Sequence, residues 1–585
     1  MNYLWKITSK VKSNKKVVVA SGVAIGIVGY FSYKYFSQQN QIMEIERITK
    51  IFQNEKESFQ QNSKEIKLLF ESIKNLNDSI PNELIQEIIS TFSPLITFEN
   101  FKTDEEACYF LFEILQIFCS KIDSVKEIKW DDYILSISKN MDFFIQQKQT
   151  EPKIADYEDY IAKGIKILAE IVRITQKREN VELILKNTQK ETFYKLFSGN
   201  QVQISIEISK LMTWMSEYNG EVIKELTDEK FLVKLIEFLS SENEELLANI
   251  CSLLRDIVLN NPKTIPIIMK NNTVNILKKL LNSKSIEVKC DSSLALSTIM
   301  KKCDLETSEF DADPNLLSII LNNFFSEKES AKKSSLIYSG LELIYSLALQ
   351  SNKNKESIRE NQFFPYILRC LEIRNQRINK LTIRTIKMLT TNSKVTHNVD
   401  EFLNLNLLEI FTAIIPEIKD DEILSDIEAI IGDVAFLSEE NRRKIQQIGL
   451  FDFLLQNLFS KNPSVQSKSV CAIANCLLSM DLQLELLKNN LLPQIIELLN
   501  SDEPNSRLGA MLSVRHLAVL GSDPPTQIWA ENASILSDLH ILTAFVRLQE
   551  KEPKFQQWIL ESIFHLSKHP KFQQEIQKYT STFKV

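Results

Sequence analysis

His565 and His569 are the residues whose spacing comes nearest to metal chemistry. They are four positions apart, so on one helix both imidazole rings would share a face. A zinc site needs a third ligand and a second shell that orients the rings. The flanking sequence IFHLSKHPKF supplies neither, and Pro570 is expected to end the helix. We therefore predict no metal ligands at this pair.

The stretch Asp311-Ala312-Asp313 matches the start of a calcium-binding loop. Such a loop needs Gly at its sixth position and Glu at its twelfth, where this chain has Leu316 and Asn322. We interpret the stretch as a turn before a helix that begins at Pro314.

Motifs for catalysis are absent from the sequence. There is no G-x-S-x-G, no phosphate-binding P-loop, no H-E-x-x-H and no kinase motif set. The serines, cysteines and histidines are too scattered to indicate a triad. We predict no catalytic residues, no metal and no cofactor, and a protein that is not an enzyme.

The glycine content indicates which elements the chain can build. It has 585 residues and 11 glycines, where ordinary usage gives about 41. Three of them, Gly22, Gly26 and Gly29, lie close together. The rest are too few for glycine-rich phosphate loops or for the turns of a many-stranded sheet. The sequence therefore predicts an all-α protein.

Charge is unevenly distributed. The first 36 residues hold six lysines and no acid, so the remainder carries 63 basic against 76 acidic residues. Such a body is not expected to bind nucleic acid, and the basic end is typical of a targeting segment. The eight cysteines form no C-x-x-C pair and lie mostly among apolar residues. We interpret them as reduced core residues of a cytosol-facing protein.

Residues 17–36, VVVASGVAIGIVGYFSYKYF, predict one transmembrane helix. Twenty helical residues span about 30 Å, the thickness of a bilayer core. Gly22 and Gly26 form G-x-x-x-G, and Ala20 and Ala24 repeat that spacing. This face would let the anchor pack against a second helix and self-associate. The alternative is a helix that is rich in small residues but has no partner.

Three topologies compete for this segment. A cleaved signal peptide lacks a small-residue cleavage site after Phe31. An endoplasmic reticulum anchor fits the excess of lysines before the helix, but it would place the unpaired cysteines in the lumen. We favour a short anchor with lysines on both flanks and the body in the cytosol, as in outer-mitochondrial and peroxisomal anchors.

The region after the anchor looks helical but not repetitive. Residues 37–80 show apolar side chains at helical spacing, which indicates either a solvated stalk or a helix packed on one side. Further helices are expected at 82–93, 104–121, 129–147 and 156–176.

From about residue 190 an apolar pair followed by a polar turn recurs every 40 to 47 residues. This period predicts a solenoid of two- or three-helix units. The pairs are Phe238-Leu239, Leu280-Leu281, Phe324-Phe325, Cys370-Leu371, Ile414-Ile415, Leu458-Phe459, Leu498-Leu499 and Phe545-Val546.

The clearest unit, residues 441–478, resembles an armadillo repeat. A short polar helix leads to Gly449, a second helix starts near Leu450, and Asn462-Pro463-Ser464 caps a third. The resemblance implies an armadillo/HEAT-like right-handed α-solenoid. Its concave groove would be lined by the third helices and would bind a protein partner.

In armadillo proteins that bind extended peptides, an Asn on each third helix grips the peptide backbone. Alignment of the units places six polar residues and Met388 at this position, with His565 as a less certain eighth. The six are our partner-groove candidates: Asp256, Thr298, Ser346, Asp433, Asn475 and His516. The alternative is that they simply face solvent. The Trp that nuclear-import receptors carry four residues earlier is missing, so binding of nuclear signals is not expected.

Two resemblances suggest an organelle. The anchor followed by an armadillo array resembles the mitochondrial outer-membrane armadillo proteins of animals, which organise mitochondrial distribution and dynamics. The first 90 or so residues also resemble the third peroxin, a peroxisomal docking receptor, through Trp5, Lys15-Lys16 and residues 59–73, FQQNSKEIKLLFESI.

Together these patterns predict a membrane-anchored armadillo scaffold on the cytosolic face of an organelle, with the mitochondrion favoured and the peroxisome or endoplasmic reticulum as alternatives. A peroxisomal biogenesis receptor and a soluble adaptor with a dispensable anchor are the competing functions. The expected divisions are a basic segment at 1–16, the anchor at 17–36, a stalk with irregular helices at 37–185 and the repeat array at 186–580.

Overall fold

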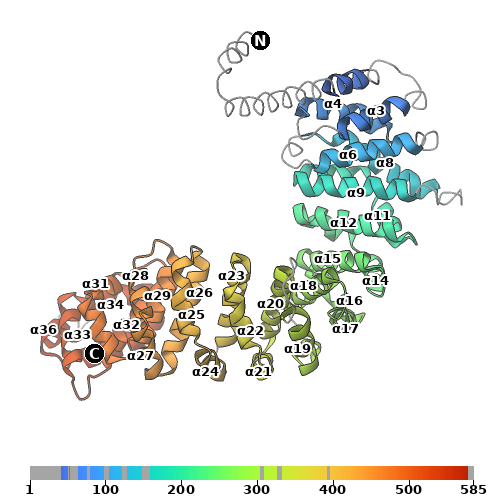
Figure 1. Ribbon diagram of the computed structural model, residues 1–585. Helices are drawn as coiled ribbons and strands as arrows, with labels where there is room; N and C mark the ends of the chain where they lie inside the picture. The colour runs from blue at the N-terminus through green and yellow to red at the C-terminus, as the bar shows by residue number, and fades with distance from the viewer. Residues whose placement is uncertain are drawn as a thin grey trace, which may run out of the picture. The chain divides into compact units, whose positions relative to one another are not determined.

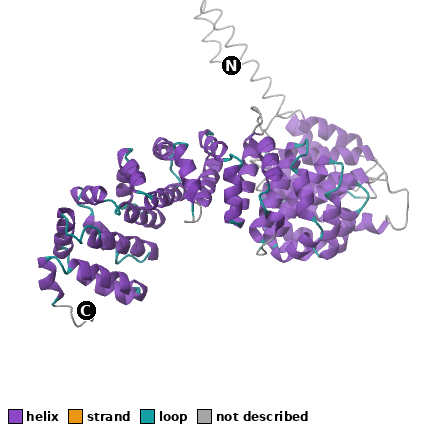
Figure 2. Ribbon diagram, turned by 90° about the horizontal axis from the view of Figure 1, so that it is seen from below, coloured by secondary structure: helices purple, strands orange, loops and turns teal. Residues whose placement is uncertain are grey.

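The computed structural model describes residues 41–50, 52, 63–74, 80–97, 100, 105–120, 128–147, 158–303, 308–325, 333–391 and 396–577. In these residues the secondary structure is helical, apart from one isolated β-bridge between Ser522 and Pro525 (Figure 2). The prediction of an all-α chain is confirmed for this part.

The predicted anchor at 17–36, with Ala20, Gly22, Ala24 and Gly26, lies outside the described residues. Among the helices that are described, none combines the length and the apolar character needed to cross a bilayer.

The chain divides into two compact units, Met1–Ile276 and Leu277–Val585 (Figure 1). The helices of unit 1 are α3 (Ser63–Lys74), α4 (Asn82–Phe92), α6 (Glu105–Ser120), α8 (Asp131–Gln147), α9 (Glu158–Thr175), α10 (Arg178–Asn187), α11 (Lys190–Ser198), α12 (Val202–Tyr218), α13 (Gly220–Leu226), α14 (Glu229–Phe238), α15 (Glu244–Asn260) and α16 (Ile265–Lys270), and α17 (Thr273–Leu280) contains the division.

The long helices of unit 1 stack in series. Helices α3, α6, α9, α12 and α15 each pack against the next. They begin 42, 53, 44 and 42 residues apart. The stacking therefore already includes the region in which the sequence shows no clear repeat, because one long interval hides the period. The helices expected before residue 180 are present. Ile45 and Ile48 are fully buried, so the helix at 41–50 is packed on one side.

Unit 2 contains α18 (Ile286–Lys302), α19 (Pro314–Ile320), α20 (Lys333–Gln350), α21 (Asn352–Glu360), α22 (Phe364–Arg369), α23 (Gln376–Thr390), α24 (Thr396–Asn404), α25 (Leu407–Ile414), α26 (Asp421–Leu437), α27 (Glu439–Gln447), α28 (Leu450–Asn457), α29 (Pro463–Cys476), α30 (Met480–Lys488), α31 (Leu492–Leu498), α32 (Pro504–Val519), α33 (Gln527–Asp538), α34 (Ile541–Lys551), α35 (Gln556–Leu566) and α36 (Pro570–Ile576). Most repeats have two short helices and a long third one. The third helices α18, α20, α23, α26, α29, α32 and α35 pack in that order.

The turn chemistry of the repeat at 441–478 is as the sequence predicts. The Asn462 side chain accepts hydrogen bonds from the backbone N–H groups of Ser464, at 2.9 Å, and Val465, at 3.4 Å, which caps α29. Gly449 lies between α27 and α28 with φ of +81°. Other repeats of unit 2 use a left-handed residue at the same junction, namely Gln362, Asn406, Asn490 and His540.

The recurring apolar pairs mark where second helices end. Helix α14 ends at Phe238, α25 at Ile414 and α31 at Leu498. The pair at Phe545 is an exception, because α34 continues to Lys551. All eight cysteines are free, and seven are buried while Cys471 is half-buried. Burial raises the pKa of the Cys370 thiol to about 12. The prediction of core cysteines is confirmed.

Candidate functional site

The six groove candidates lie on the third helices α15, α18, α20, α26, α29 and α32, and α23 between α20 and α26 carries Met388 at this position. We call these six residues the polar ladder. Asp256, Thr298 and Ser346 are buried, whereas Asp433, Asn475 and His516 are half-buried. The ladder is therefore less exposed than the floor of an open groove would be.

Two ladder residues join neighbouring third helices. Asn475 Nδ2 donates to the carbonyl of Gly432 on α26, at 2.9 Å. His516 Nδ1 lies 2.8 Å from the carbonyl of Ala474 on α29, so this nitrogen carries the proton and donates. Burial lowers the pKa of His516, which favours the neutral ring. Both side chains use polar groups to hold consecutive helices in register.

The two ladder carboxylates are also engaged within the stack. Asp256 accepts a hydrogen bond from Ser216 Oγ on α12, at 3.3 Å, and one from Arg255 Nε, at 3.1 Å. Asp433 accepts from Thr391 Oγ1 at 3.4 Å. Burial raises the pKa of both carboxyls, because desolvation penalises the charged form. Ionisation of these two carboxyls therefore costs more free energy than it would at an exposed site.

The remaining two ladder hydroxyls bond within their own helices. Thr298 Oγ1 donates to the carbonyl of Leu294 at 2.8 Å, and Ser346 Oγ donates to that of Glu342 at 2.7 Å. All six ladder side chains thus have a hydrogen-bond partner inside the stack. A bound peptide would have to share or replace these bonds.

Exposed apolar side chains stand one helical turn beyond the ladder. Leu259, Leu349 and Phe436 each follow a ladder residue by three positions, and they are 47%, 44% and 60% exposed. Leu478 and Val519 occupy the same offset and are half-buried. We call Leu349, Phe436, Leu478 and Val519 the apolar column of unit 2, and Leu259 is its counterpart in unit 1.

Residues three positions apart on a helix share a face, so Leu259, Leu349, Phe436 and Val519 lie on the same face of their third helices as the ladder, whereas Leu478 lies in the turn after α29. The column was not recognised from the sequence. The signal that would have found it is an apolar residue three positions after five of the six ladder residues; Lys301 occupies this offset from Thr298.

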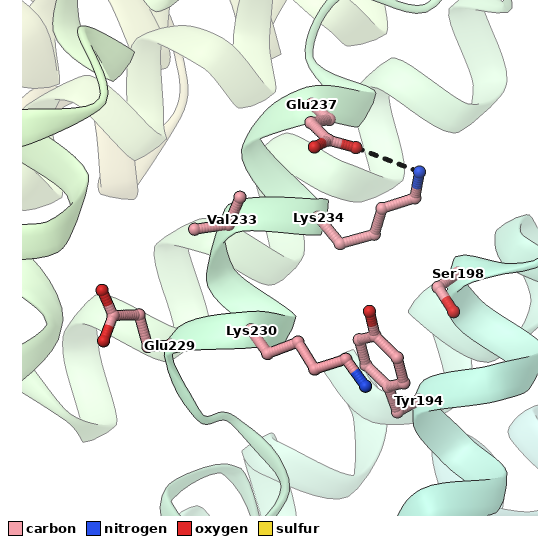
Figure 3. A pocket seen from close by; sticks show the side chains of 7 residues that line it. All are labelled: Tyr194, Ser198, Glu229, Lys230, Val233, Lys234 and Glu237. Atoms are coloured by element: carbon pink, nitrogen blue, oxygen red, sulfur yellow. Dashed lines mark hydrogen bonds and ion pairs between the residues drawn. The ribbon is translucent and has the colours of Figure 1, made fainter.

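A surface hollow in unit 1 lies between α11 and α14 (Figure 3). The Lys230 side chain extends toward Tyr194, with Nζ 4.0 Å from the ring centroid, and Lys234 Nζ lies 3.0 Å from a Glu237 oxygen. Glu229 points away on the other side of α14 in this view. Lys234 is therefore paired with a carboxylate, whereas the Lys230 ammonium is held over an aromatic ring and keeps its charge.

His565 and His569 both make contacts within the fold. Ser522 Oγ donates to the carbonyl of Val519 at 2.7 Å, so it accepts from His565 Nδ1, 2.6 Å away. The His569 ring packs edge-on against Trp529, 6.0 Å between centroids. Within the described ranges, no group of three His, Cys, Asp or Glu side chains could hold a metal ion.

The Asp311–Asp313 stretch is the predicted turn. Asp313 caps α19, accepting from the Leu316 N–H at 2.9 Å, and Asp311 pairs with Lys353 Nζ at 2.9 Å.

Comparison with known proteins gives a fold. No family model matches the chain, and no curated protein matches it. One matching solved structure is titled "Crystal Structure of Engineered Protein", from the Northeast Structural Genomics Consortium. It is 16% identical, has a TM-score of 0.55 and covers 75% of this chain and 99% of its own. At this identity the likeness shows the fold alone. The chain is therefore an all-α protein of stacked helices, similar in fold to that engineered protein.

Proposed function

We propose that this protein is an armadillo-like scaffold that binds an extended segment of a partner protein along the face of its third helices. The observation that carries the proposal is the apolar column, whose exposed members Leu349 and Phe436 lie beside the polar ladder. Exposed apolar patches are a feature of interaction surfaces.

The spacing of the column suits an extended chain. Packed helices lie about 8–10 Å apart, and an extended chain in the polyproline II conformation advances about 3.1 Å per residue with three residues per turn. A partner with an apolar side chain at every third residue would therefore present these side chains on one face and meet one column residue per repeat. Thr391, directly after α23, occupies the column offset, so the partner is expected to carry a polar residue there.

The proposal includes an organelle membrane. The small-residue anchor at 17–36, preceded by the basic segment at 1–16, would hold the body on the cytosolic face, with the mitochondrial outer membrane as the site and organelle distribution or tethering as the role. Its support is the sequence pattern of lysines flanking a short apolar stretch.

A photo-crosslinking experiment tests partner binding. A benzophenone amino acid is placed at Phe436 and, as a matched control, at Phe459, which is 59% exposed and follows the second helix α28. The expected result is a crosslink from position 436 to a partner peptide with the apolar spacing described above, and no such crosslink from 459. The same proteins crosslinked from both positions would contradict the proposal.

A localisation experiment tests the anchor separately. A C-terminal fluorescent fusion is imaged with organelle markers, and the body is challenged with protease on intact organelles. Mitochondrial label with a degraded body is the expected result. Peroxisomal sorting by residues 1–80 alone would favour the peroxin-like alternative, and unchanged localisation after deletion of residues 1–36 would favour a soluble adaptor. A protease-protected body would exclude the cytosolic topology.

A further inference from the structure

Helices α23 and α26 face each other with opposite charges. The residues from α23 are basic, and those at the start and in the first turns of α26 are acidic. The ion pairs are Lys380 Nζ–Asp420 Oδ2 at 3.1 Å, Arg384 Nη2–Glu422 Oε1 at 3.2 Å and Lys387 Nζ–Asp426 Oδ1 at 2.6 Å. Lys380 also pairs with Glu422, and Arg384 lies 3.8 Å from Asp426. The six side chains thus form one connected network.

This network is partly open to water. The exposed fractions of its side chains run from 15% for Asp426 to 62% for Glu422. Ion pairs of this kind contribute about 0–1 kcal/mol each, and salt screens exposed charges over about 3 Å at 1 M. The contact between α23 and α26 therefore depends on ionic strength.

The neighbouring contacts are built differently. Helices α26 and α29 approach so closely at Gly432 that an added Cβ would lie 3.1 Å from the Ala472 Cα. Helices α29 and α32 meet at Gly509, where a Cβ would lie 2.8 Å from the Cys471 nitrogen. Close packing of this kind does not depend on salt and resists sliding.

The second-helix edge of the same contact is open. A groove of about 700 Å³ lies between the turn after α22 and the turn after α25; its lining mixes isoleucines such as Ile373 and Ile423 with polar residues, and it reaches Asp420 of the network. A second groove of about 400 Å³ adjoins it and shares Leu371 and Ile414. The turns of these two repeats therefore leave open space beside the network.

We propose that the α23–α26 contact is a salt-sensitive joint about which unit 2 bends. The ion-pair network spans the contact, and the grooves, which begin beside Asp420, leave room for the two repeats to rotate. Separation of the paired charges needs little repacking, because these side chains are already partly hydrated. The inference goes beyond the proposed function and needs no partner, so its failure would leave that function untouched.

Distance measurement by pulsed electron paramagnetic resonance tests the joint in the full chain. Nitroxide labels are placed at Arg369→Cys and Ala413→Cys, which are exposed and line the smaller groove, with Cys471→Ser removing the half-buried native thiol. The control pair is Ala413→Cys with Gln456→Cys, across the next repeat. Raising NaCl from low concentration to about 1 M is expected to shift and broaden the joint distances and leave the control distances unchanged.

Charge reversal provides the second arm. Lys387→Glu is expected to produce the same shift at low salt, and adding Asp426→Lys is expected to restore the original distances. The salt titration needs no charge variant, so it decides the question even where Lys387→Glu impairs folding. Joint distances that do not change with the NaCl concentration would overturn the proposal. Control distances that change as much as the joint distances would also overturn it.

Discussion

Glu428 is an acidic residue that the fold buries completely. It lies in α26 with 0% exposure, and one carboxyl oxygen accepts a hydrogen bond from Asn457 Nδ2 at 2.7 Å. Burial raises the pKa of this carboxyl to about 8. Because the folded pKa lies above the unfolded one, the native state keeps a proton that the unfolded state loses as the pH rises.

Stability of unit 2 is therefore expected to fall with pH. The Glu428 contribution is fully present below about pH 4.5 and is lost at about 1.4 kcal/mol per pH unit as the pH rises toward about 8. Glu428→Gln removes this titration and keeps an acceptor for Asn457. Denaturant unfolding at several pH values measures the effect: the variant should gain stability relative to the native chain as pH increases. Glu497→Gln, on the exposed face of α31, is the control, and an equal gain there would contradict the assignment.

At the scale of elements, Gly449 and Gly509 are needed for different physical reasons. Gly449 joins α27 to α28 at φ +81°, and an added Cβ there would meet nothing within 4 Å. Gly509 lies inside α32 against the backbone of α29. The first glycine is needed for its backbone conformation and the second for space.

Alanine substitution at each glycine separates these roles. Gly449→Ala is expected to cost about 1 kcal/mol, because an L-residue is strained in the left-handed region. Gly509→Ala is expected to cost about 1–3 kcal/mol by overpacking, although Gly→Ala inside a helix ordinarily stabilises by about 0.5–1 kcal/mol. Thermal unfolding gives the sign of each, and hydrogen exchange should show loss of protection at α29 and α32 only for Gly509→Ala. A stabilised Gly509→Ala would refute the close contact.

At the scale of the molecule, the chain consists of repeats whose contacts are mostly with their neighbours. Stability in such proteins is the sum of local terms, so unfolding need not be two-state. The two compact units are therefore expected to respond separately to damage in their cores.

Matched cavity substitutions test this separation. Ile208 on α12 and Ile473 on α29 are both fully buried, one in each unit. Truncation of either to Ala is expected to cost about 2–5 kcal/mol. Hydrogen-exchange mass spectrometry should localise the loss of protection to the unit that carries the substitution. Equal loss in both units would show that the chain unfolds as one body.

The sequence by itself determined the all-α class, the recurring ends of the second helices and the turn at Gly449 and Asn462. These features are local: helical periodicity, a capping side chain and a left-handed glycine act within a few residues of one another. The sequence pattern did not predict that α3, α6 and α9 at the N-terminal end of the stack pack in series, because one interval of 53 residues interrupts the period.

Only the tertiary structure decided how the third-helix face is used. It showed that ladder residues such as Asn475 and His516 form hydrogen bonds to the preceding third helix. It also showed that Leu349 and Phe436, three positions after other ladder residues, remain exposed. It also showed the segregation of charge between α23 and α26. Each of these features depends on contacts between side chains that are about 40 residues apart in the chain. The helical period predicts which face of one helix is buried, but it does not predict which residues of the neighbouring helix contact that face.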